Sequence, residues 1–352
     1  MADNRENIFD TLTEDVANSS NLPESEKQKM LQNILHLRSQ KLNIMITGAT
    51  GAGKSSTINA LFDANVAKVG VGSTPETMDI KKYELNNLIL WDSPGLGDGK
   101  AADERHSRNI INKLREQDSN GKALIDLVLV ILDGSTRDYG TSYELINNVV
   151  IPNLGNASDK KNRILVAINQ CDAAMKGKHW NWDKNMPDST LENFLNEKVR
   201  SVQSRIKDST GVDIEPIYYS AGYKESDDEK QNPYNLSKLL YFIIQHTPEE
   251  KRLVYVDTLS KEKENWKDNE KFNQKTKSDS KEPENEKPQT YQEAIQESFA
   301  QTIVTHVVTG ATIGKTVGGV FGKTGEKIGA VVGGVVGAGV AFGKKIWKSI
   351  FG

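Results

Sequence analysis

The chain has 352 residues, of which 45 are basic and 48 acidic, with a formal net charge of −3. That length allows one well-cored domain of about 200 residues with extra segments, or two domains. The near-neutral balance does not favour nucleic acid as a partner, and no basic patch stands out. The single cysteine, Cys171, excludes an internal disulfide and fits a reducing compartment.

The first 40 residues are predicted to form an N-terminal helical extension. They begin acidic and polar, without an apolar core of signal-peptide length, so export through a cleaved signal is not expected. After Pro23, an acidic turn leads into a stretch in which apolar residues recur at helical spacing from Met30 to Leu37. This stretch predicts one helix with a buried stripe.

Short runs that read as strands alternate with helical stretches between residues 41 and 250. Four of the runs are apolar almost throughout, which is typical of strands covered on both faces of a parallel sheet. The run at 79–84 is followed at once by LNNL, which predicts a hairpin into 88–92 and hence one antiparallel edge strand. The pattern predicts a doubly wound α/β domain with a mostly parallel six-stranded sheet. The six predicted strands are 42–47, 79–84, 88–92, 124–133, 163–169 and 215–220.

A charged linker is predicted over residues 251–290. Its stretch 261–288 is nearly all Lys, Glu, Asn, Asp and Ser. So little apolar surface cannot offset the entropy of ordering the chain, so we expect a solvated helix or a disordered linker.

The last segment, 291–352, is predicted to be helical, with glycines spaced four residues apart. Because each interior glycine costs a helix about 1 kcal/mol relative to alanine, some packing must compensate. A flat glycine strip lets two helix backbones approach closely, as in membrane helix pairs. Two alternatives stay open: a glycine-zipper hairpin that associates with membrane lipid through residues 300–352, and a helical hairpin that packs on itself or drives oligomers. The glycines are Gly310, Gly314, Gly318, Gly322, Gly325, Gly329, Gly333 and Gly337.

The stretch GATGAGKS, from Gly48 to Ser55, fits the pattern G-x-x-x-x-G-K-[ST] between a predicted strand and a predicted helix. Glycines let consecutive backbone N–H groups point into one concavity, and the following helix adds its N-terminal partial charge. Lys54 would reach the β- and γ-phosphates of a nucleotide, and the Ser55 hydroxyl would ligate Mg²⁺. An ordinary glycine turn is the alternative, which the strand and helix on either side disfavour. The predicted phosphate-binding residues are Gly48, Ala49, Thr50, Gly51, Ala52, Gly53, Lys54, Ser55 and Ser56.

The motif DSPG places Asp92 at the end of the third predicted strand, three residues before Gly95. An Asp at that position holds Mg²⁺ through a water, and the glycine amide is placed to sense a γ-phosphate, which makes the loop a switch. A threonine of the first switch would contact both Mg²⁺ and the γ-phosphate, and we take Thr77 in preference to Thr74. The predicted metal ligands are Ser55, Thr77 and Asp92, and the predicted catalytic residues are Lys54, Thr77 and Gly95.

The stretch NQCD places Asn169, Gln170 and Asp172 after the fifth predicted strand. An Asp carboxylate accepts hydrogen bonds from N1–H and the 2-amino group of guanine, whereas adenine offers neither donor in that arrangement. The backbone of Ser220 and Ala221, after the sixth strand, is placed to meet the guanine O6. The sequence therefore predicts a guanine-nucleotide site.

Taken in order, GATGAGKS, Thr77, DSPG, NQCD and SAG resemble the five signature elements of small Ras-like GTPases. The resemblance covers roughly residues 40 to 247. It is closest to the bacterial Era/TrmE-like branch, with its prophage-type relatives described as 50S ribosome-binding GTPases. It implies a Ras-like P-loop GTPase fold and Mg²⁺-dependent hydrolysis of GTP to GDP and phosphate. The ribosome as a partner is implied by this resemblance alone.

Two positions depart from the family's pattern. Gln170 stands where the usual N-K-x-D has a lysine that braces the P-loop, so guanine affinity is expected to be weaker. Leu96 stands where Ras-like proteins have a water-orienting glutamine. Hydrolysis is therefore expected to be slow, or to be completed by another group, a dimer partner or a bound cation.

Two functional hypotheses follow. The first is a GTPase switch whose output runs through the glycine-zipper region. The second is a nucleotide-gated membrane-active or oligomerising protein with little intrinsic hydrolysis. The expected location is the cytoplasm, peripheral to or inserted in the inner (plasma) membrane, and a homodimer or oligomer is the expected assembly.

Overall fold

The computed structural model describes residues 8–20, 22–62, 80–97, 99–224, 230–267, 269, 270, 272 and 290–307. The chain divides into two compact units. The sheet unit comprises Leu42–Thr247 and Glu262–Asn269, and the helical unit comprises Met1–Lys41, Pro248–Lys261 and Glu270–Gly352.

A six-stranded sheet forms the centre of the sheet unit, in the order β2-β3-β1-β4-β5-β8. All neighbours pair in parallel except β2, which pairs antiparallel with β3 across a turn at Asn86 and Asn87. This arrangement confirms the predicted mostly parallel six-stranded sheet with one antiparallel edge strand. The strands are β1 (Leu42–Gly48), β2 (Lys81–Leu85), β3 (Leu88–Asp92), β4 (Leu127–Asp133), β5 (Ile164–Asn169) and β8 (Ile217–Tyr218).

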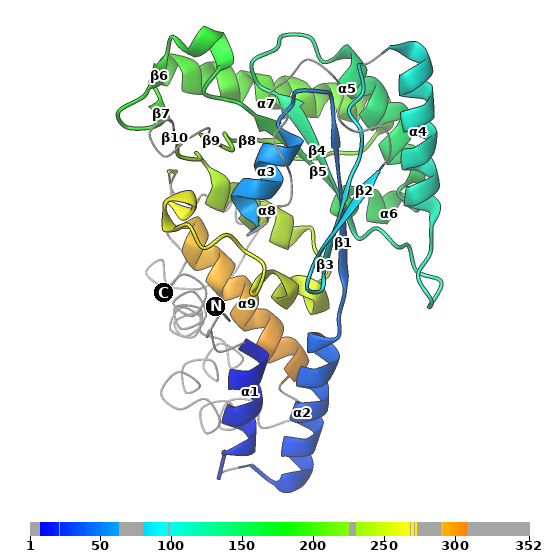
Figure 1. The fold of residues 1–352 in the computed structure, drawn as a ribbon, viewed down its shortest axis with the longest axis vertical. Coiled ribbons are helices and arrows are strands. Elements are labelled where there is room, and N and C mark those ends of the chain that lie inside the picture. The colour runs from blue at the N-terminus through cyan, green and yellow to red at the C-terminus, as the bar shows by residue number, and fades with distance from the viewer. Residues whose placement is uncertain are drawn as a thin grey trace. The chain divides into compact units, whose positions relative to one another are not determined.

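Helices follow the strands along the chain (Figure 1). The longest, α7, begins where the Asp188 carboxylate accepts hydrogen bonds from the amides of Thr190 and Leu191, and it ends at Gly211 in the left-handed conformation. The helices are α3 (Lys54–Leu61), α4 (Lys100–Arg115), α5 (Gly140–Glu144), η1 (Leu145–Val150), η2 (Ile151–Asn153), α6 (Ala157–Lys160), η3 (Lys161–Arg163), η4 (Ala174–Gly177), α7 (Ser189–Thr210), α8 (Leu236–Gln245) and η6 (Lys263–Trp266). Two short hairpins pair β6 (Trp180–Asn181) with β7 (Met186–Pro187), and β9 (Tyr223–Lys224) with β10 (Lys230–Gln231).

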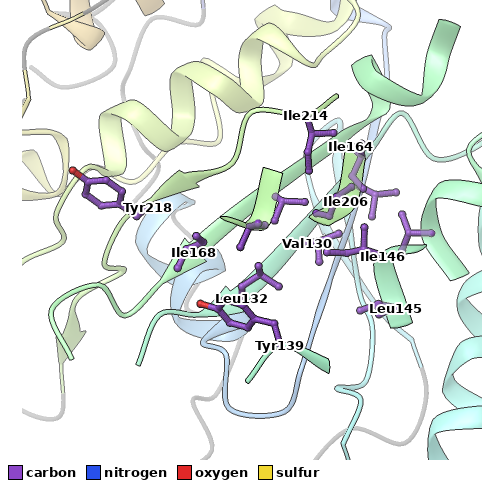
Figure 2. Close-up of a cluster of buried hydrophobic side chains, with 14 of the residues drawn as sticks. Val130, Leu132, Tyr139, Leu145, Ile146, Ile164, Ile168, Ile206, Ile214 and Tyr218 are labelled. Carbon is purple, nitrogen blue, oxygen red and sulfur yellow. The ribbon is translucent and has the colours of Figure 1, made fainter. Parts of the chain in front are cut away.

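The main apolar core of the sheet unit lies on one face of the sheet. Side chains alternate along a strand, so Val130 and Leu132 of β4 and Ile164 and Ile168 of β5 enter this cluster together. Figure 2 shows them with residues of η1 and α7, among them Ile206. Because both faces of the central strands are covered, every residue of β1 is buried, as the continuous apolar runs predicted.

The helical unit contains α1 (Ile8–Ala17), α2 (Glu24–Arg38), η5 (Glu249–Tyr255) and α9 (Tyr291–Val307). The helix predicted after Pro23 is α2, which packs against α1, α9 and η5. The Asn33 side chain donates to the carbonyl of Val307 at 3.3 Å, which links α2 to α9.

The structure differs from the expected charged linker over part of its length. Leu253 and Leu259 are buried in the helical unit, and Trp266, 2% exposed, is buried in the sheet unit. The prediction was based on the average composition of the segment, which is charged. These few apolar residues are nevertheless buried, because they pack against the rest of the protein. Residues 273–289 of the expected linker lie outside the described residues.

Residues 262–269, which we call the strap, return to the sheet unit between two segments of the helical unit. The Asn265 side chain donates to the carbonyl of Ala60 at 3.1 Å in the last turn of α3. The Ser237 hydroxyl donates to the carbonyl of Trp266 at 3.0 Å, which fastens the strap to α8. The strap therefore holds the end of the helix that follows the glycine-rich turn.

The predicted glycine zipper from Gly310 to Gly337 lies outside the described residues. Within the part of the chain that the structure does describe, no helix has the length and apolar character needed to cross a membrane.

Candidate nucleotide site

The glycine-rich turn joins β1 to α3, as its motif requires. Gly51 and Gly53 adopt left-handed backbone conformations, with φ of 82° and 85°. A side chain at Gly48 would overlap the carbonyl oxygen of Ile131 on β4. The turn is thus built from backbone that only glycine adopts without strain, and Ser55 and Ser56 follow in the first turn of α3.

Lys54 lies folded over this turn. Its ammonium group donates to the carbonyls of Gly48 at 3.2 Å and Ala49 at 3.1 Å. These carbonyls hold the cation at the loop, where it opposes the rise that burial causes in the pKa of Asp92. The loop thus places one positive charge beside its own backbone amides, an arrangement suited to phosphates.

Asp92 ends β3 and is 4% exposed. Burial raises the pKa of this carboxyl to about 6, although Lys54 and Lys81 oppose that rise. Its Oδ1 atom is buried and has no hydrogen-bond partner among the residues that the structure describes. A buried acceptor with an unfilled lone pair beside the phosphate loop fits the oxygen donor set that Mg²⁺ prefers.

The DSPG loop packs directly on the P-loop. Gly95 has no room for a side chain, because a Cβ there would lie 2.6 Å from the Cα of Thr50. The Thr50 amide donates to the carbonyl of Leu96 at 3.1 Å. The Leu96 side chain is 4% exposed and belongs to the apolar core cluster. It therefore packs in the core, and it has no polar group that could orient a water molecule.

Asn169 joins three loops that are far apart in the sequence. This buried side chain donates from Nδ2 to the carbonyl of Ala52 at 3.0 Å, and its Oδ1 accepts from the amide of Ala221 at 2.9 Å. A single amide group thereby fixes the P-loop and the SAG loop at the carboxyl end of β5. Both halves of the predicted site meet at this residue.

Gln170 takes part in the same junction. Its Nε2 donates to the carbonyl of Gly51 at 2.7 Å, and its backbone adopts a left-handed conformation with φ of 58°. The brace predicted for the family's lysine is therefore present here as a neutral hydrogen bond. This contact was not expected from the sequence, which showed only the missing charge.

Asp172 lies two residues beyond Gln170, and its Oδ1 is buried. This atom has no hydrogen-bond partner within the described part of the chain. An unpaired buried carboxylate oxygen is costly unless a ligand supplies donors. The N1–H and 2-amino groups of guanine are donors of the required kind.

The backbone amides of Ser220 and Ala221 are both engaged within the protein. Ser220 donates to the carbonyl of Tyr234 at 3.0 Å, and Ala221 donates to Asn169. Both N–H groups therefore already have acceptors in the protein. Their contact with the guanine O6 stays a prediction. Thr77 and its alternative Thr74 lie outside the described residues.

Sequence reasoning missed a buried support beneath the P-loop. The Thr57 hydroxyl donates to the carbonyl of Gly53 at 2.8 Å and lies 2.6 Å from the hydroxyl of Tyr219. Because Thr57 has one hydroxyl hydrogen, Tyr219 must be the donor between them. Burial raises the pKa of Tyr219, so this phenol remains protonated. The position of Thr57, three residues after Lys54, was the only available signal.

Residues 43–170 match a family model described as 50S ribosome-binding GTPase. The matched segment has the Ras-like strand order and the P-loop described above, and the family's description supports GTP or GDP with Mg²⁺ as its ligands. It contains the P-loop, DSPG and the first half of NQCD.

Known proteins are similar to the chain over stretches of 85 to 158 residues. It is 33% identical over 100 residues to Translocase of chloroplast 125 of Physcomitrium patens, which covers 28% of the chain and 9% of that protein. It is 39% identical over 85 residues to Interferon-gamma-inducible GTPase 10 of Mus musculus, covering 22% and 19%. It is 28% identical over 158 residues to protein YkfA of Escherichia coli K12, covering 44% and 50%. The chain thus spans at most half the length of these relatives.

Some proteins of known structure are similar to this chain at low sequence identity. Toc33 of Arabidopsis thaliana, in complex with GDP and Mg²⁺, has a TM-score of 0.41 and 14% identity, covering 71% of this chain and 98% of that one. Era of Aquifex aeolicus, bound to GDP and AlF4⁻, has a TM-score of 0.36 and 18% identity, covering 59% and 57%.

Proposed function

We propose that this chain, whose residues 43–170 form a P-loop GTPase domain, is a molecular switch that binds GTP and hydrolyses it to GDP and phosphate. The observation that carries the proposal is the Asn169 junction. It brings the phosphate loop, the NQCD loop and the SAG loop together, and Asp172 of the NQCD loop has a buried oxygen without a hydrogen-bond partner among the described residues. The loops proposed to bind the phosphates and the loops proposed to bind guanine are therefore joined in one site.

The phosphate side of the reaction depends on charge. Lys54 balances the negative charge of the β- and γ-phosphates, and the Gly95 amide binds the γ-phosphate that water attacks. Ser55, Thr77 and Asp92 would hold Mg²⁺, which when bound supplies further charge neutralisation at the phosphates. Buried Asp92 suits this role, because a cation nearby favours its ionised form.

The base side of the site selects guanine. The Asp172 carboxylate accepts from the two donors on one edge of the base, while the Gln170 stem covers its face. Asn169 positions the P-loop and the SAG loop, and Ser220 and Ala221 belong to that SAG loop. An adenine would leave the Asp172 oxygen buried and unpaired, which lowers its affinity.

Slow hydrolysis is part of the proposal. Leu96 lies in the apolar core, so no side chain at this position orients the attacking water. Turnover then requires another group, which a second copy of the chain, an activating partner or a bound cation would provide.

The second candidate function is a nucleotide-gated membrane-active or oligomerising protein in which binding itself is the signal. The same position of Leu96 favours it, because binding does not need an oriented water. The glycine spacing after residue 309 supplies the element that would contact lipid or a second copy. On either proposal the protein works in the cytoplasm, peripheral to or inserted in the inner membrane. A ribosome partner has only the description of the matched family in its support.

One experiment tests the proposed function. Calorimetry of the full chain with GTP, GDP and ATP in the presence of Mg²⁺ should show guanine binding at least tenfold tighter than adenine binding. Equal affinities for GTP and ATP would refute the base assignment. Phosphate release with and without lipid vesicles then separates the two candidates. Release that vesicles stimulate supports a coupled GTPase, and negligible release in both conditions supports the binding protein.

A further inference from the structure

His106 lies on α4 with 1% of its surface exposed. Its Nδ1 is 3.0 Å from the carbonyl oxygen of Gly95, eleven residues earlier in the chain. A carbonyl oxygen only accepts hydrogen bonds, so Nδ1 carries the hydrogen and donates it. This hydrogen bond fixes the orientation of the ring, because Nδ1 must face the DSPG loop.

The other ring nitrogen of His106 has no such role. Nε2 is buried and has no hydrogen-bond partner among the described residues. Burying an imidazole with one unpaired nitrogen costs stability that an aliphatic side chain of similar size would not cost. The bond to Gly95 is thus the one polar interaction of this ring that the described structure shows, and it identifies what the histidine contributes.

Gly95 is held on both of its sides. Before it, Ser93 is fixed to β1, where its amide donates to the carbonyl of Ile46 at 3.0 Å and its hydroxyl donates to the Thr47 hydroxyl at 2.7 Å. The peptide after it is fixed by His106 through the Gly95 carbonyl. Next to it, the carbonyl of Leu96 accepts from the Thr50 amide of the P-loop. These bonds leave Gly95 little freedom to rotate.

We propose that His106 is a positioning residue for γ-phosphate recognition, which holds the Gly95 carbonyl so that the Gly95 amide faces the γ-phosphate. The inference rests on the proposed function, in which that amide binds only the third phosphate. The α- and β-phosphates meet the P-loop, and the base meets the NQCD and SAG loops. His106 therefore controls the preference for triphosphate over diphosphate and leaves GDP binding unchanged.

The test compares His106→Leu and His106→Gln with the parent chain. Leucine removes the donor and is similar in size, whereas the glutamine amide can still donate to the Gly95 carbonyl. His179→Leu is the matched control, because this histidine bonds to Asp188 at the start of α7 instead. Dissociation constants for GDP and for a non-hydrolysable GTP analogue are measured by calorimetry with Mg²⁺.

We expect His106→Leu to weaken binding of the GTP analogue by about 3- to 10-fold, the value of one lost hydrogen bond, while GDP affinity stays within about twofold. His106→Gln should recover part of that loss, and His179→Leu should change neither value. Steady-state GTP turnover of His106→Leu should fall with the analogue affinity.

Equal losses for GDP and the GTP analogue would overturn the proposal, because they would show a general structural role. Unchanged affinities for both nucleotides in His106→Leu would overturn it as well. If that variant does not fold, His106→Gln decides alone: a loss of analogue affinity larger than the loss of GDP affinity supports the positioning role, and equal losses, or none, oppose it. A parent chain that bound neither nucleotide would instead overturn the proposed function itself.

Discussion

Asn169 donates a hydrogen bond of 3.0 Å to the carbonyl of Ala52, a P-loop residue 117 positions earlier in the chain. The same side chain accepts from the amide of Ala221, 52 positions later. Because its two polar atoms are used on two different loops, no other residue type of similar size can replace it fully. The integrity of the nucleotide site therefore depends on this one buried amide.

Asn169→Ala should both destabilise the domain and lower its affinity for every nucleotide. The substitution leaves the buried groups of Ala52 and Ala221 without partners, at a cost of about 1–3 kcal/mol in the free energy of unfolding. Urea denaturation measures that cost, and calorimetry measures GTP, GDP and XTP affinity. Asn162→Ala, at an exposed position of η3 before β5, is the control. Unaltered stability in Asn169→Ala would contradict the joining role.

Lys54→Ala should abolish detectable nucleotide binding. Lys54 supplies the positive charge that the P-loop places beside the β- and γ-phosphates. Circular dichroism should show a folded chain, because the loop carbonyls that accept from Lys54 can accept from water instead. Fluorescent GDP titration is the measurement, with Lys41→Ala as a control at the start of β1. Micromolar binding by Lys54→Ala would place the phosphates elsewhere.

Asp172→Asn should move the base preference from GTP toward XTP. Xanthine carries an oxygen where guanine carries its 2-amino group, so it needs a donor where guanine needs an acceptor. We expect GTP affinity to fall at least tenfold and XTP affinity to rise above it. Competition against labelled nucleotide gives both values. If GTP remains preferred, Asp172 does not read the base.

Asp92→Asn should make the metal-free chain more stable at neutral pH. Burial raises the pKa of Asp92 to about 6 from the ordinary 3.8, so the folded state binds this proton more tightly than the unfolded state does. The ionised carboxylate therefore costs stability above about pH 6, and the cost fades as the pH falls toward 4. We expect a gain of about 1–3 kcal/mol at pH 7 without Mg²⁺.

Thermal melts in EDTA at pH 7 and pH 5 measure this difference, which should be smaller at pH 5. With GDP and Mg²⁺ the order should reverse, because the parent gains metal binding that Asp92→Asn lacks. Asp208→Asn, at an exposed carboxylate on α7, should show neither effect. The same gain at both pH values would mean that the carboxyl does not titrate as proposed.

Asn265→Ala should loosen the strap from the end of α3. The Ala60 carbonyl loses a buried donor, which costs about 1–3 kcal/mol in unfolding free energy. Trypsin should then cut faster at Lys263 and Lys267, and the cleavage rate is the measurement. Glu264→Ala, whose side chain is about half exposed in its pair with Lys267, is the control within the strap. Equal cleavage in both variants would argue against anchoring by Asn265.

Local signals were enough for the framework of the sheet unit. The strands were predictable because central parallel strands are apolar on both faces, and the antiparallel edge followed from the short turn at Asn86. The P-loop was predictable because its glycines adopt backbone conformations that other residues avoid. The buried residues of 253–266 were not predictable from the charged composition, since a few apolar side chains decide burial.

The sequence by itself determined the fold class, the phosphate loop and the order of the motifs, because each depends on periodicity or backbone preference within a few residues. Only the tertiary structure decided the direction of Leu96, the reach of Gln170 to Gly51, the two bonds of Asn169 and the isolation of the Asp172 oxygen. Each of these depends on groups brought together from distant parts of the chain. Sequence spacing does not encode such contacts, because packing of the whole domain sets them.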